Sequence, residues 1–132
     1  MIIGIVKEIK NNEYRVAATP IVVAEIVNHG HKVVFEKDAG LGSGYSDDEY
    51  KAAGAEIYNN AENVWLEAEM IYKVKEILPE EFKYLRENLI VFTYIHSNAY
   101  RKQTEALIKS RCTSIAYEDI SDSPAGDRKS VV

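Results

Sequence analysis

The stretch MIYKVKEILPEE, residues 70–81, contains a buried strand, a charged boundary and the start of a helix. Its first five residues are mostly apolar. Lys75 then interrupts the run, and a proline with two glutamates follows, as at the first turn of a helix. A short run that is apolar on both faces is typical of a strand in a parallel sheet, where helices cover both sides. The stretch therefore predicts a parallel strand that ends in positive charge.

Runs of the same kind recur and alternate with helical patterns. We expect strands at residues 2–6, 32–36, 55–58, 70–74, 89–94 and 114–117, and helices at 20–28, 47–53, 61–68, 79–86 and 100–110. Parallel strands need crossovers of about this length. The sequence therefore predicts an α/β fold of one domain, a Rossmann-like (flavodoxin-like) parallel sheet flanked by helices.

Residues at several predicted helix ends support these boundaries. Thr19 before Pro20 is a typical N-cap followed by proline at the first helical position, and Gly30 stands where that helix should end. Ser46 followed by Glu49 is a capping box, in which two side chains bond backbone amides at the helix start.

Composition limits the classes of function. The chain has 132 residues, with 16 Lys and Arg against 21 Asp and Glu, and the basic residues are scattered, which argues against nucleic acid as a partner. Its single cysteine, Cys112, has no partner for an internal disulfide, which fits a reducing cytoplasmic setting. The apolar N-terminus is too short for a signal peptide or a membrane span. No metal-binding pair of histidines stands out.

Three polar residues follow predicted strands and are candidates for a ligand site. Arg15 lies in the loop after the first strand, Lys75 follows the fourth and His96 follows the fifth. In open parallel sheets, ligands bind beyond the carboxyl ends of the strands, so all three side chains can point into one crevice. Each also has a structural alternative: a surface ion pair for Arg15, a lysine reaching to solvent for Lys75, and a structural histidine for His96.

A glycine cluster, AGLGSGYSDDEY at residues 39–50, is the one stretch that suggests a nucleotide. Its spacing is G-x-G-x-G, however, and it follows the second predicted strand instead of the first, whereas a dinucleotide fingerprint reads G-x-G-x-x-G after the first strand. We therefore predict a tight surface loop or a subunit contact, with no cofactor bound to this chain.

Read together, four segments resemble a known family. MIIGIVKEIKNNEYRVAATP (1–20), AGLGSGYSDDEYKAAGAEI (39–57), KVKEILPEEFKYLRENLIVFTYIH (73–96) and SIAYED (114–119) are similar to the N-terminal half of alanine dehydrogenases, with the nicotinamide nucleotide transhydrogenase alpha chain as a relative. The glycine loop and the KVKE and FTYIH motifs resemble alanine dehydrogenases more closely.

The resemblance implies a substrate-binding domain in residues 1–120 of an enzyme that oxidises L-alanine to pyruvate and ammonia with NAD. It implies that Arg15, Lys75 and His96 bind the substrate, that Lys75 and His96 are also catalytic, and that the protein is a homo-oligomer. Lys73, two residues before Lys75, would share its face in a regular strand.

The sequence departs from the family after residue 119, and we expect residues 121–132 to be a linker or a truncated tail. The NAD-binding domain is not found in these 132 residues, so we expect it on a separate chain or a longer one, and no turnover by this chain alone. Two alternatives stay open: a non-catalytic module that binds keto or amino acids or serves assembly, and a fragment of a transhydrogenase alpha chain.

Overall fold

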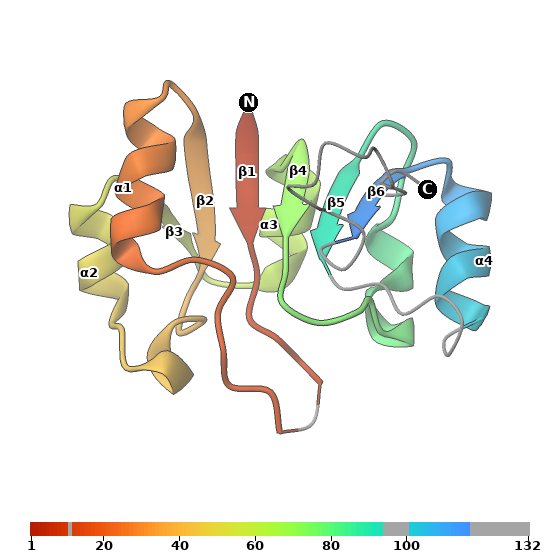
Figure 1. Ribbon diagram of the computed structural model, residues 1–132, viewed down its shortest axis with the longest axis horizontal. Coiled ribbons are helices and arrows are strands. Elements are labelled where there is room, and N and C mark those ends of the chain that lie inside the picture. The colour runs from red at the N-terminus through yellow and green to blue at the C-terminus, as the bar shows by residue number, and fades with distance from the viewer. Residues whose placement is uncertain (11, 94–100, 117–132) are drawn as a thin grey trace, which may run out of the picture.

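The computed structural model describes residues 1–10, 12–93 and 101–116. Parallel strands alternate with helices along the chain (Figure 1). The strands are β1 (Ile2–Ile5), β2 (Lys32–Glu36), β3 (Glu56–Tyr58), β4 (Met70–Tyr72), β5 (Ile90–Thr93) and β6 (Thr113–Ala116). The α-helices are α1 (Pro20–Asn28), α2 (Asp47–Ala52), α3 (Ala61–Glu67) and α4 (Arg101–Ser110), and two 3-10 helices are η1 (Leu41–Ser43) and η2 (Pro79–Tyr84).

All neighbouring strands of the sheet are parallel, in the order β3-β2-β1-β4-β5-β6. The predicted parallel α/β fold is confirmed. This order is that of Rossmann sheets, whereas flavodoxin sheets run 2-1-3-4-5. The chain builds outward from β1 to β3 and then returns to the other side of β1 with β4. The switch point, where a crevice for a ligand is expected, therefore lies between β1 and β4.

Helices cover both faces of the sheet, and a separate apolar cluster fills each side. Val33 and Phe35 of β2 pack with Tyr50 of α2 and Val23 of α1, while Val34 faces the cluster around α3 and α4. Neighbouring residues of β2 thus belong to opposite clusters, as the two-residue period of a strand requires. This explains why the strands read as continuous apolar runs.

The predicted helix signals are present in the structure. Thr19 Oγ1 accepts a hydrogen bond from the Val22 amide at 3.3 Å, and Pro20 is the first residue of α1. Ser46 and Glu49 form the capping box at the start of α2. Gly30, just beyond α1, has a φ of +93°, a conformation that residues with a side chain rarely adopt.

Two boundaries in the region 70–86 differ from the prediction. The predicted α-helix at 79–86 is a 3-10 helix at Pro79–Tyr84, and its Glu81 is buried and paired with Lys73. The predicted strand at 70–74 ends at Tyr72. The amides of Val74 and Lys75 donate to the side chain of Glu8 instead of continuing the ladder.

Candidate functional site

The candidate site lies at the switch point, beyond the carboxyl ends of β1 and β4. Two irregular segments meet there: residues 6–19, which connect β1 to α1, and residues 73–78, which connect β4 to η2. In Figure 1 the first of them projects well beyond the sheet edge below β1. These segments carry Arg15 and Lys75.

Arg15 is held in place by Glu13, two residues earlier. Arg15 Nε donates to Glu13 Oε2 at 2.9 Å and Nη2 donates to Oε1 at 2.9 Å, a two-pronged contact. The Arg15 backbone amide also donates to Glu13 Oε2, at 2.9 Å. The Glu13 side chain is 6% exposed, whereas that of Arg15 is 63% exposed. The ion pair predicted as the alternative for Arg15 is thus present, and the guanidinium still faces solvent.

Lys75 lies close enough to act on the same carboxylate. The pKa of Glu13 is lowered to about 2, chiefly by hydrogen bonds from Arg15 and against a raising effect of burial, and the charge of Lys75 contributes to the lowering. A pocket of about 450 Å³ joins the two cations, and it is lined by Lys10, Asn12, Glu13, Tyr14, Arg15 and Lys75. The structure therefore brings two of the three predicted site residues to one pocket. His96, the third, lies outside the described residues.

The low pKa of Glu13 gives a direct prediction. The Glu13 carboxyl carbon is expected not to titrate above pH 3 in a carbon-13 NMR experiment, because Arg15 stabilises the charged form. In Arg15→Ala the midpoint is expected to rise toward the ordinary glutamate value of about 4.3. Since the folded-state pKa is lowered, this group stabilises the fold above the unfolded value and loses that effect as pH falls toward 2. An unchanged midpoint in the variant would contradict the pairing.

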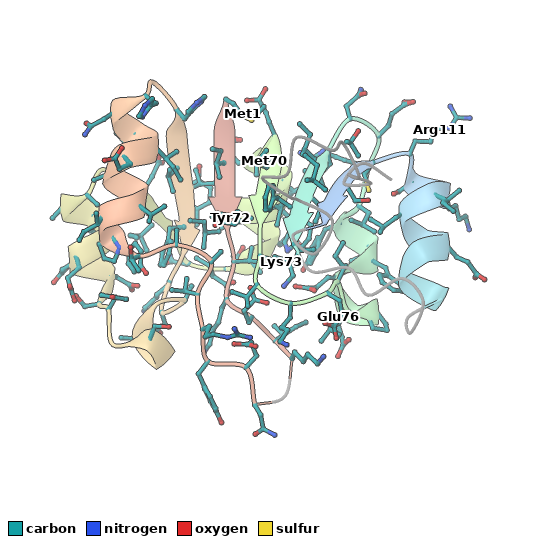
Figure 2. All side chains as sticks on the ribbon, viewed as in Figure 1. Met1, Met70, Tyr72, Lys73, Glu76 and Arg111 are labelled. Carbon is teal, nitrogen blue, oxygen red and sulfur yellow. The ribbon has the colours of Figure 1, made fainter. Side chains whose placement is uncertain are left out.

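Regular strand geometry predicted that Lys73 shares a face with Lys75. In the structure Lys73 lies outside the candidate site. Its side chain is 1% exposed, and its Nζ lies 3.0 Å from Glu8 Oε1 and 3.2 Å from Glu81 Oε2. Figure 2 shows Lys73 directly beyond Tyr72, where β4 has ended. Burial alone lowers the pKa of Lys73, but Glu81 and Glu8 more than offset it and hold that pKa above its ordinary value. Lys73 is therefore a charged structural residue.

The glycine cluster supports the segment that carries Arg15. A Cβ on Gly42 would lie 2.5 Å from the Tyr14 carbonyl oxygen, so only glycine fits without movement. Ser43 Oγ donates to the same oxygen at 3.3 Å. Sequence reasoning missed this contact, because nothing in the sequence pairs residue 42 with residue 14.

Neither a membrane-spanning helix nor a metal-binding cluster occurs among the described residues. Within residues 1–10, 12–93 and 101–116, no helix has the length and apolar character needed to cross a bilayer. In the same ranges no three histidine, cysteine, aspartate or glutamate side chains gather so that they could hold a metal ion.

Comparison with protein families gives a match over nearly the whole chain. The profile described as "Alanine dehydrogenase/PNT, N-terminal domain" matches residues 4–131. The chain belongs to this family. Alanine dehydrogenase of Mycolicibacterium smegmatis is 52% identical over 120 residues, and that of Bacillus subtilis is 51% identical over 122 residues. These matches cover 91% and 92% of the chain but 32% of each relative.

Solved structures agree with the sequence relatives. An L-alanine dehydrogenase superposes with a TM-score of 0.90 at 42% identity, covering 95% of this chain and 34% of that one. The transhydrogenase of Sinorhizobium meliloti gives a TM-score of 0.86 at 29% identity, covering 95% of this chain and 37% of that one. The predicted resemblance is confirmed, and this member of the alanine dehydrogenase/PNT N-terminal family corresponds to about a third of its full-length relatives.

Proposed function

We propose that the chain is the substrate-binding N-terminal domain of an NAD-dependent alanine dehydrogenase, and that it binds pyruvate or L-alanine by the carboxylate. One observation carries the proposal: Arg15 and Lys75, which come from segments 60 residues apart, line a single pocket at the switch point. Glu13 offsets part of their positive charge, and an anionic ligand in the pocket can accept charge-assisted hydrogen bonds from both cations. Higher identity to alanine dehydrogenases than to the transhydrogenase favours this activity.

Each residue has a role in the proposed reaction. Arg15 holds the substrate carboxylate with its planar guanidinium, which orients the α-carbon. Lys75 binds the carboxylate or the carbonyl oxygen and favours negative charge that develops there. His96, as the family resemblance implies, transfers protons as acid and base.

In a full-length enzyme, NAD would supply the acceptor for a hydride from the α-carbon. The described residues do not fit it. Gly42, in the one glycine-rich loop of the described chain, is covered by the Tyr14 carbonyl. The helix that follows begins with Asp47, Asp48 and Glu49, which repel a pyrophosphate. We therefore assign the cofactor to another part of a full-length enzyme. From the family resemblance and the single cysteine, we also propose that the enzyme is a cytoplasmic homo-oligomer.

The proposal is tested by NMR titration of the chain with pyruvate. Backbone amide resonances of Arg15 and Lys75 are expected to shift with a saturable curve and a Kd of about 1 mM, which corresponds to roughly 4 kcal/mol. Pyruvamide, a neutral analogue of similar shape, is the control and is expected to produce much smaller shifts. Equal shifts with both compounds, or none with pyruvate, would exclude a carboxylate site.

A further inference from the structure

Lys75 lies in an irregular segment, yet buried side chains form hydrogen bonds with both its backbone amide and its backbone carbonyl. Its amide donates to Glu8 Oε1 at 3.2 Å, and its carbonyl oxygen accepts a hydrogen bond from Thr93 Oγ1. Glu8 is 7% exposed and Thr93 is fully buried. Glu8 belongs to the segment after β1, and Thr93 is the last residue of β5. The segment after β1 and the end of β5, the two strands that flank β4, thus hold both backbone polar groups of Lys75 between them.

Glu8 accepts two further donors from the same segment. The Val74 amide donates to Glu8 Oε2 at 2.9 Å, and the Lys73 ammonium donates to Oε1 at 3.0 Å. Hydrogen bonds to an ionised carboxylate are stronger than neutral ones, and a buried carboxylate with three donors is well satisfied. One side chain therefore binds the backbone amides of Val74 and Lys75 and the ammonium of Lys73, although these residues belong to no regular element.

We propose that Glu8 and Thr93 are positioning residues that set where Lys75 enters the substrate pocket. The inference rests on the proposed function of Lys75. Glu8 lies on the same segment as Arg15, so its bonds to the amides of Val74 and Lys75 tie the backbone of one cation to the segment that carries the other. Lysine is a flexible side chain, and the position of its backbone decides which pocket sites its ammonium can reach. Small displacements of binding groups are known to weaken function strongly.

The test compares Thr93→Val with Thr93→Ser. Valine has nearly the shape of threonine but cannot donate to the Lys75 carbonyl, whereas serine keeps the hydroxyl. Pyruvate affinity, measured by NMR, is expected to fall about fivefold in Thr93→Val, a size typical of the coupling between two residues in contact. In Thr93→Ser it is expected to stay within about twofold of the parent value. In a Lys75→Ala background, Thr93→Val is expected to cause no further loss, because its effect acts through Lys75.

The background comparison separates positioning from a general loss of structure. Two results of Thr93→Val would count against positioning: equal weakening of binding in the parent and in the Lys75→Ala background, or an unchanged affinity in the parent. Either result overturns this inference and leaves the proposed function standing. If the unmodified chain binds no pyruvate, the proposed function falls and this inference with it. Should Thr93→Val fail to fold, Glu8→Gln replaces it in the same cycle. A glutamine there removes the charge and cannot accept all three donors, so the same dependence on Lys75 is expected.

Discussion

Lys73→Met is expected to lower the free energy of unfolding by about 3–5 kcal/mol, the cost of removing one partner from a buried ion pair. Methionine fills similar space but leaves the carboxylates of Glu8 and Glu81 buried without their cation. That loss is a large share of the roughly 5–15 kcal/mol that stabilises a typical domain. The measurement is urea denaturation followed by circular dichroism, in which the midpoint should fall sharply.

Two variants control for this prediction. Lys32→Met removes the cation of the pair with Glu56, whose side chains are 48% and 55% exposed, and it is expected to leave the urea midpoint nearly unchanged. Adding Glu81→Gln to Lys73→Met is expected to recover part of the loss, because glutamine removes a buried charge and can still accept from the Leu78 amide. A midpoint of Lys73→Met equal to that of Lys32→Met would contradict a buried network.

The loss in Lys73→Met should also depend on pH. Burial raises the pKa of Glu81 even in the presence of Lys73, and removing the cation raises it further. With a folded-state pKa above the unfolded one, the native protein binds more protons than the unfolded chain as pH rises above about 4.5. The free energy of unfolding therefore falls with rising pH in that window. The variant is accordingly expected to be closer to the parent at pH 5 than at pH 8.

The sheet was predictable because local and global signals agree. The apolar runs at 2–6 and 32–36 become β1 and β2 with little or no change of boundary. Thr19, Pro20 and Ser46 mark helix starts through bonds that involve only the next three residues. Such short-range chemistry is visible in the sequence itself.

The buried charges were not predictable in the same way. Lys73, Glu8 and Glu81 are residues that usually stay on the surface, and their burial depends on partners 65 and 8 residues from Lys73. The same network binds the amides of Val74 and Lys75 just after β4, and it includes Glu81 of the 3-10 helix η2. The early end of β4 therefore could not be read from residues 70–74, because it depends on Glu8, which is far away in the sequence.

The candidate site was partly predictable for a geometric reason. Residues just beyond parallel strands gather at one edge, and this places Arg15 and Lys75 together without knowledge of their neighbours. The contacts that orient them were not foreseen in detail. The sequence predicted an ion pair as an alternative for Arg15 without singling out Glu13 as its partner, and Glu8 and Thr93 gave no sequence signal for bonds to the Lys75 backbone.

Arg15→Ala is expected to weaken pyruvate binding at least tenfold, because hydrogen bonds to charged groups contribute about 1.5–3 kcal/mol. The loss of pyruvate affinity should exceed the loss that the missing Arg15 contact causes by itself. Without Arg15, the Glu13 carboxylate stays next to the pocket with less compensation and repels an anionic ligand. The measurement is the pyruvate titration described above, in which shifts at Lys75 should no longer saturate in the accessible range.

A matched control and a double variant identify the cause of that loss. Arg111→Ala removes an arginine whose side chain is 79% exposed, far from Lys73 in Figure 2, and it is expected to leave pyruvate affinity unchanged. Glu13→Gln in the Arg15→Ala background is expected to restore part of the affinity, since it removes the repelling charge but not the lost contact. If the double variant binds no better than Arg15→Ala, Glu13 does not act through its charge. If Arg15→Ala binds pyruvate like the parent, the carboxylate is held elsewhere, and Arg15 serves only as the surface partner of Glu13.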